Sequence, residues 1–72
     1  MIARRVYHVR RQGESWHVLR EGFRRPHIIR NSKAEAVTMA KRLAKLGPGA
    51  RVVVHAGNDE VEREFSYAPA AI

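Results

Sequence analysis

Four histidines are the side chains in this sequence best suited to acid–base or metal chemistry: His8, His17, His27 and His55. A zinc site needs three or four ligands at about 2 Å, usually with cysteine partners or with histidines at helical spacing. The sequence has no cysteine, no His-Glu-x-x-His string and no His-x-x-x-His pair. We therefore expect no metal site.

A single histidine can still act as a general acid or base, as in small toxin-like RNases. His8 or His55 fits that role, with Arg10 stabilising the charge of a phosphate group. The spacing of the residues selects neither histidine, and histidines on a sheet surface are more often solvated than catalytic. We expect no catalytic residue and no enzymatic activity, and a toxin-like RNase is the third hypothesis for function.

Arginine supplies the clearest pattern outside the core. Lysine and arginine number 14 against 7 aspartates and glutamates, and 11 of the 14 cations are arginine. The planar guanidinium group binds phosphate oxygens in a bidentate geometry. Net charge is also segregated, at +6 in residues 1–30, +3 in residues 31–49 and −2 in residues 50–72. This pattern favours binding to the backbone of DNA or RNA, although it is also typical of charge that only keeps a small domain soluble.

The predicted nucleic-acid-binding surface combines side chains from the first sheet segments, the loop after them and the helix. It consists of Arg10, Arg24, Arg25, Arg30, Lys41, Lys45 and His17. The sequence contains no helix-turn-helix pattern, aromatic RNA-binding string or Gly-x-x-Gly clamp, so we expect binding without strong sequence specificity. The glycines form no nucleotide-binding string, and we expect no cofactor.

The segregated charge also supports an alternative, a homo-oligomerising interaction protein with no nucleic-acid role. The first predicted hairpin is basic on its outer face, and the last one carries Glu62 and Glu64 there. Two copies related by a two-fold axis would pair these patches in a homodimer. A chain of 72 residues also has a thin core, which is a reason to associate.

Two β-branched and aromatic segments, residues 5–11 and 15–21, flank Gln12-Gly13-Glu14 and predict a hairpin that turns at Gly13 and Glu14. The implied register pairs Arg11 with Trp16, Val9 with Val18, and Tyr7 with Arg20. Strand alternation places the core face on Tyr7, Val9, Trp16 and Val18, and the outer face on Val6, His8, Arg10, His17 and Leu19.

Residues 27–30 predict a short third strand, and a helix follows. Ser32-Lys33-Ala34-Glu35 fits a capping box, in which the Ser32 hydroxyl accepts a hydrogen bond from the Glu35 amide. The apolar stripe of this helix consists of Ala36, Val37, Ala40, Leu43 and Ala44. Gly47-Pro48 predicts its end.

Residues 51–55 predict another strand, and Gly57-Asn58-Asp59-Glu60 predicts the turn into the last one. With the tip at residues 58–59, Val54 pairs with Arg63 and Val52 with Phe65. The inward residues are then Val52, Val54, Val61 and Phe65, and the outward ones are Val53, His55, Glu62 and Glu64, with Glu62 opposite His55.

The expected fold is therefore α+β with two layers, an antiparallel sheet of four to five strands and one helix, in the order β-β-(β)-α-β-β. It occupies residues 4–67 as a single domain, and residues 68–72 form a frayed tail. No apolar run reaches the length of about 18 residues that a membrane span needs, and the N-terminus leads into no signal-type stretch. We expect a soluble, cytoplasmic protein that does not associate with membranes.

The order of these segments resembles domain-of-unknown-function family 2188, a family of small bacterial proteins. The resemblance rests on Tyr7-His8-Val9, Trp16-His17-Val18, Ser32-Lys33-Ala34-Glu35-Ala36 and Val52-Val53-Val54-His55, and it extends from about Tyr7 to Tyr67. The sequence departs from the family at the second turn, where Asn58-Asp59 replaces Asp-Gly, and in its higher arginine content. The resemblance implies the fold but no activity, because the matching residues are structural.

Overall fold

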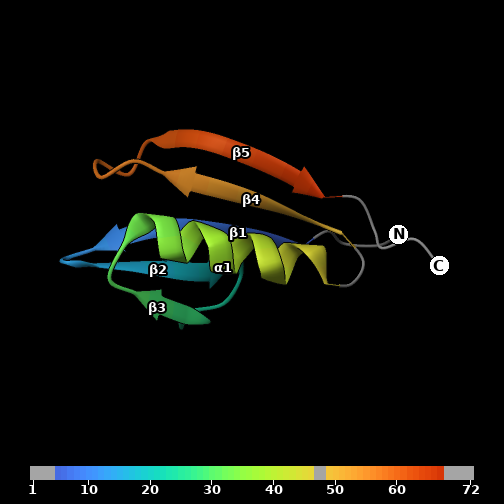
Figure 1. Ribbon diagram of the computed structural model, residues 1–72, viewed down its shortest axis with the longest axis horizontal. Coiled ribbons are helices and arrows are strands. Elements are labelled where there is room, and N and C mark those ends of the chain that lie inside the picture. The colour runs from blue at the N-terminus through green and yellow to red at the C-terminus, as the bar shows by residue number, and fades with distance from the viewer. Residues whose placement is uncertain (1–4, 47–48, 68–72) are drawn as a thin grey trace.

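A five-stranded sheet with one helix packed against one of its faces forms the fold (Figure 1). The computed structural model describes residues 5–46 and 49–67. Their elements are β1 (Arg5–Gln12), β2 (Ser15–Arg20), β3 (Ile28–Arg30), α1 (Lys33–Lys45), β4 (Ala50–His55) and β5 (Val61–Tyr67). The expected α+β class and the order β-β-β-α-β-β are confirmed.

The first hairpin adopts the predicted register. Val9 lies opposite Val18, and Arg11 lies opposite Trp16. The turn is made by Gly13, at φ 60°, and the residue after it. Val9 and Val18 have no exposed surface, so the predicted core face is the one that packs beneath the helix.

The sheet is mixed, which corrects the expectation of a fully antiparallel one. Strand β4 pairs with β1 in parallel, with Tyr7 opposite Val52, and the strand order is β3-β2-β1-β4-β5. The cause is the connection through α1, which carries the chain back across the sheet so that β4 starts at the same end as β1 (Figure 1). Strand β1 thereby becomes the central strand.

Helix α1 rests on the sheet through three alanines. Ala36, Ala40 and Ala44 are spaced four residues apart and are at most 1% exposed. Because their side chains are small, the helix backbone can lie close to the valines of β1, β2 and β4. Val37 and Leu43 flank the alanines and pack against the same core, which confirms the predicted apolar stripe.

The start of α1 follows the predicted cap. The Glu35 amide donates a hydrogen bond to Ser32 Oγ over 3.2 Å, and Ser32 has an extended backbone. The helix is neither long nor apolar enough to span a membrane, and the described residues contain no other helix. The predicted stop at Gly47-Pro48, the domain start at residue 4 and the tail at 68–72 lie outside the described residues.

The last hairpin is predicted correctly in its body but not near its turn. Val52 lies opposite Phe65 and Val54 opposite Arg63, as expected. The register then shifts between Val54 and His55, so that His55 lies opposite Val61 instead of Glu62. This irregularity reverses two side chains: Val61 is 57% exposed rather than inward, and Glu62 lies on the side of α1.

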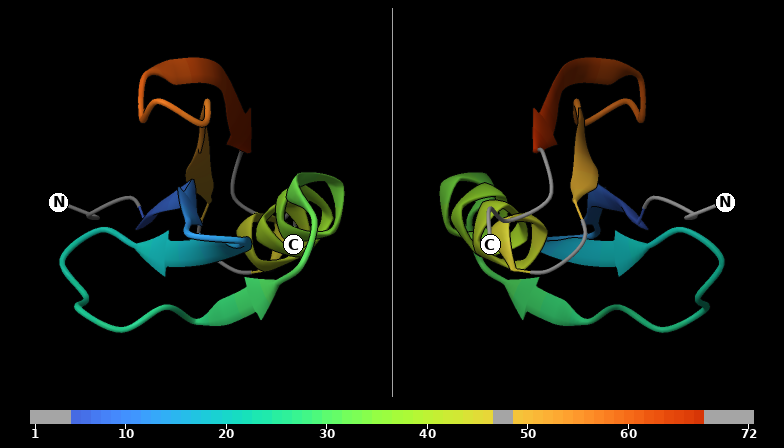
Figure 2. Two further views of the ribbon diagram at one scale, coloured as in Figure 1. Left: turned by 90° about the vertical axis from the view of Figure 1, so that its left-hand side faces the viewer. Right: turned by 90° about the vertical axis from the view of Figure 1, so that its right-hand side faces the viewer.

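The tip of this hairpin shows how the chain accommodates its departure from the family pattern. Asp59 has φ 72°, the left-handed conformation that a glycine adopts without strain. Strands β4 and β5 of this hairpin turn away from the plane of β1–β3 (Figure 2). Helix α1 therefore packs on β1–β4, and β5 rises beside it without being covered.

Candidate functional site

A groove lies between α1 and the last hairpin, and the helix contributes a regular stripe to it. Lys33, Val37, Lys41 and Lys45 are each four residues apart, which places them on one side of the helix, one turn after another. Lysine tips at these positions reach toward β5, while the alanines beside them hold the helix on the sheet. The helix therefore presents a line of three ammonium groups beside the open hairpin.

Strand β5 supplies the other wall. Arg63, Phe65 and Tyr67 alternate along the strand and share the face that looks toward α1, since each lies opposite an inward residue of β4. The Lys41 ammonium lies 4.1 Å from the centre of the Phe65 ring, and the Lys45 ammonium lies 6.0 Å from the centre of the Tyr67 ring. A cation thus lies over each aromatic ring of this strand.

The cation–aromatic pair occurs twice because four residues of α1 and two residues of β5 advance by similar distances. Four helical residues rise about 6 Å, and two strand residues rise about 6.7 Å. The step from Lys41 to Lys45 therefore nearly matches the step from Phe65 to Tyr67. We call the lysines and rings of these two pairs the Lys–aromatic ladder.

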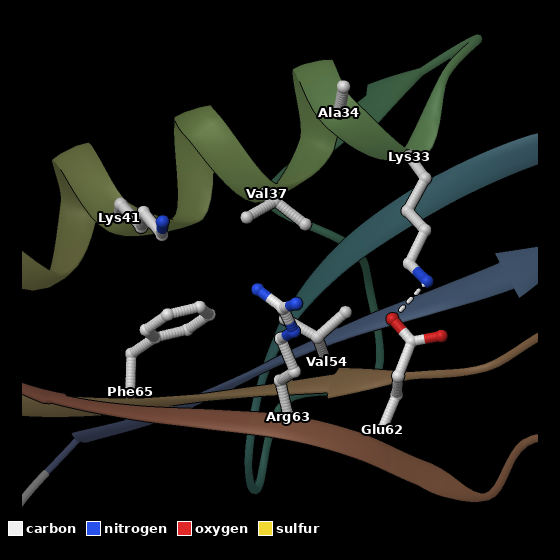
Figure 3. Close-up of a pocket in the computed structure, with 8 residues that line it drawn as sticks. All are labelled: Lys33, Ala34, Val37, Lys41, Val54, Glu62, Arg63 and Phe65. Carbon is white, nitrogen blue, oxygen red and sulfur yellow. Dashed lines mark hydrogen bonds and ion pairs between the residues drawn. The ribbon is translucent and has the colours of Figure 1, made fainter.

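The groove itself has a volume of about 730 Å³ and is open to solvent. Its lining is Lys33, Ala34, Val37, Lys41, Val54, Glu62, Arg63 and Phe65, and the Lys45–Tyr67 pair is not part of this lining. Figure 3 shows Arg63 extending from β5 toward the helix, and an ion pair between Lys33 and Glu62 that bridges one end. Three cations and one carboxylate line the groove, so its net charge is positive.

These side chains suit a polyanion with flat rings. Ammonium and guanidinium groups bind phosphate oxygens, and aromatic faces stack on bases of any sequence. Val37 and Val54 add an apolar floor, and Lys41 can move from the Phe65 ring because its long side chain is flexible.

The structure does not bring the predicted binding residues onto one surface. Lys41 and Lys45 belong to the Lys–aromatic ladder on the helix side. Arg10 and His17 lie opposite each other in positions that alternate with the core residues, so they occupy the other face of the sheet. The predicted footprint assumed that these faces adjoin, but the helix and sheet separate them.

The remaining predicted residues lie in the connection after β2 and on the edge strand β3. Arg24 and Arg25 are exposed in the connection from β2 to β3. Arg30 lies opposite Trp16 on the edge strand β3 and donates to the carbonyl of Ile29 over 2.8 Å. Sequence analysis did not assign Arg63, Phe65 and Tyr67 to a site. The pattern that could have indicated them is the alternation of these three residues along one strand, together with lysines four residues apart on the helix.

The outer face holds a second cluster that sequence analysis also missed. His8 Nδ1 lies 3.0 Å from His55 Nε2, and His8 Nε2 lies 3.1 Å from Glu21 Oε1. His55 Nδ1 lies 3.1 Å from the backbone carbonyl of Asp59. The parallel pairing of β1 with β4 creates this chain, because it places His8 opposite Val53, two residues before His55.

Neither region resembles a metal centre. Within residues 5–46 and 49–67, no three histidines, aspartates or glutamates gather closely enough to hold a metal ion. The histidine chain has two imidazoles and a carboxylate in a line, rather than around a point.

Comparisons with known proteins connect the chain to one family. The model of DUF2188, described as an uncharacterised protein conserved in bacteria, matches residues 7–67. No curated protein and no solved structure matches the chain. The match covers the helix and all five strands except the first two residues of β1, and it confirms the family resemblance seen in the sequence.

Proposed function

Because this chain belongs to DUF2188, a family of uncharacterised bacterial proteins, no relative supplies an activity for it, and we propose a function from its own surface. The chain is a non-enzymatic nucleic-acid-binding protein that holds a single strand of RNA or DNA in the groove between α1 and β5. Binding depends on phosphate contacts and base stacking, without strong sequence specificity.

The Lys–aromatic ladder is the observation that carries this proposal. A single strand carries a phosphate and a base in every nucleotide, so it needs cations and stacking platforms that alternate at short intervals. The ladder offers two such units in succession, and Arg63 adds a further cation beside Phe65. Proteins that bind single strands without sequence preference combine a positive groove with aromatic side chains in this way.

The shape of the groove favours a single strand over a duplex. Phe65 and Tyr67 are half-buried side chains of β5 that pack against the core, so a base must leave its stack to reach them. The bases of a duplex are already stacked and paired. A duplex can therefore contact the lysine tips but not the rings.

The proposal is tested by measuring the binding of labelled single-stranded RNA, single-stranded DNA and duplex DNA at two salt concentrations. For single strands, the logarithm of the affinity falls by about 0.7 per phosphate contact for each tenfold rise in salt. We expect both single strands to bind more tightly than the duplex. Affinity no tighter than millimolar for all three at low salt would refute the proposal.

A homo-oligomer is the second candidate, and the uncovered strand β5 favours it. This strand has seven residues and lies at the edge of the sheet, with its outer backbone groups facing away from β4. Edge strands of this kind pair readily with another chain. Sedimentation of the free protein tests the idea, because a clean monomer at high micromolar concentration would eliminate it.

The RNase hypothesis can be checked in the same binding reactions. His8 and His55 are hydrogen-bonded to each other, so a scissile phosphate cannot lie between them without separating the rings. We expect the labelled RNA to stay intact during the assay. Cleavage that disappears in both His8→Ala and His55→Ala would establish the nuclease instead.

A further inference from the structure

The histidine chain on the outer face fixes which ring nitrogens carry protons. The Asp59 carbonyl can only accept, so His55 Nδ1 is the donor in their 3.1 Å contact. A neutral His55 then has a bare Nε2, which accepts from His8 Nδ1 over 3.0 Å. His55 is 5% exposed, so this arrangement is shielded from water and persists.

The hydrogen bond to His55 determines when the other ring nitrogen of His8 can carry a proton. With Nδ1 donating to His55, His8 Nε2 carries a proton only when the ring is a cation. The Glu21 carboxylate lies 3.1 Å from Nε2 and can only accept when ionised. All three hydrogen bonds of the chain therefore form together only when His8 holds both ring protons and an anion lies against Nε2.

Glu21 lines a small pocket together with two arginines. The pocket has a volume of about 310 Å³ and is lined by His8, Arg10, Arg20, Glu21 and Phe23, among others. The Arg20 guanidinium lies 5.0 Å from the centre of the Phe23 ring. Two guanidinium groups and the His8 imidazole thus line one pocket, and one exposed carboxylate is the only acid among its lining residues.

We propose that this pocket is a binding site for a phosphate group, and that Glu21 is an internal carboxylate that occupies the anion position until the phosphate displaces it. A tetrahedral anion with several oxygens can accept from His8 Nε2 and from the arginines that line the pocket. A carboxylate has only two oxygens, and Glu21 contacts His8 alone. Two arginine forks with an imidazolium favour phosphate over a carboxylate ligand.

Glu21 is placed so that it can leave. Its side chain is 64% exposed, and it precedes Gly22, which has φ 91° in the connection after β2. An exposed ion pair of this kind is weak, so a multivalent anion can replace it. When Glu21 is displaced, the His8 ring keeps its position, because its Nδ1 remains hydrogen-bonded to His55 Nε2.

The other charged groups near His8 lie on the neighbouring strands and turns of the outer face, and most of them have partners of their own. Those on the strands and turns around His8 are Arg10, His17, Arg51, His55, Asp59 and Glu64. Arg51 lies 3.5 Å from Glu64, and Arg10 lies 3.8 Å from Asp59. The pair with Asp59 is exposed, and Arg10 can turn from it toward a phosphate in the pocket that it lines.

Calorimetric titration with inorganic phosphate, and with sulfate as a tetrahedral anion that does not titrate, tests the proposal. Glu21→Gln removes the competing charge and should tighten the binding of both anions about threefold to fivefold. Glu14→Gln makes the same charge change in the turn of the first hairpin and should leave affinity nearly unchanged. Acetate should bind more weakly than either anion.

Two further variants locate the anion. His8→Gln and Arg20→Gln should each weaken sulfate binding at least tenfold, and either one suffices if the other fails to fold. Equal effects of Glu21→Gln and Glu14→Gln, or unchanged binding in His8→Gln and Arg20→Gln, would overturn the proposal. Single-strand binding in the groove does not depend on this outcome.

Discussion

Replacing Lys41 and Lys45 together by glutamine should remove most of the salt dependence of single-strand binding. Both lysines lie over aromatic rings of β5, and neither forms an ion pair with another described residue. Glutamine is nearly as good a helix former as lysine, and an exposed cation–aromatic contact contributes only about 0.5–1 kcal/mol. The double variant should therefore fold, which circular dichroism can confirm.

The size of the effect follows from the number of groove cations. Lys41 and Arg63 line the groove and Lys45 follows one helical turn after Lys41, so these three are available for phosphate, whereas Lys33 is paired with Glu62. Three contacts predict a log–log salt slope of about −2.1 on a single strand, and one contact predicts about −0.7. Between 20 and 200 mM salt the wild-type protein should lose roughly 130-fold in affinity and the double variant roughly fivefold.

Fluorescence anisotropy with a short labelled single strand measures both slopes. The matched control is the double variant Arg24→Gln/Arg25→Gln, which removes the same charge from the exposed loop after β2. The groove predicts that the control keeps the slope of the wild-type protein. A control slope that falls as far as that of the Lys41/Lys45 variant would show that net charge, and not the groove, determines binding.

Three further variants test the groove and its support. Phe65→Leu should weaken single-strand binding about tenfold at constant salt slope, because stacking contributes about 1–3 kcal/mol per base and leucine keeps the apolar contact with the core. Ala40→Leu should lower the free energy of unfolding by about 1–3 kcal/mol, since Ala40 is fully buried where α1 meets the sheet, and urea denaturation measures the loss. Ser32→Ala should lower it by about 1 kcal/mol through loss of the cap to Glu35, and an unchanged urea midpoint would contradict that role of Ser32.

The parts of the fold that depend on neighbouring residues were predictable from sequence. The turn at Gly13 sets the register of the first hairpin, and Ser32 with the alanine stripe sets the start and the buried face of α1. The partner of β4 was not predictable, because parallel pairing depends on where the crossover helix returns the chain. The register shift beside His55 was hidden as well, since alternation alone gives no sign of an extra residue in a strand.

The same limits explain the candidate site. Sequence identified Lys41 and Lys45 as one turn apart, but it could not place β5 beside them. It treated His8 and His55 as separate surface residues, because their contact requires the parallel pair of β1 and β4. Arg10 and His17 were paired correctly and then combined with lysines that lie on the opposite face.

The most direct test of the proposed function is an NMR titration of isotope-labelled protein with a short single-stranded RNA. The account predicts that the largest chemical-shift changes fall on α1 from Lys33 to Lys45 and on β5 from Arg63 to Tyr67, which carry the groove and the Lys–aromatic ladder. Changes confined to His8, Arg10 and His17 on the outer face, or to the loop at Arg24 and Arg25, would contradict it.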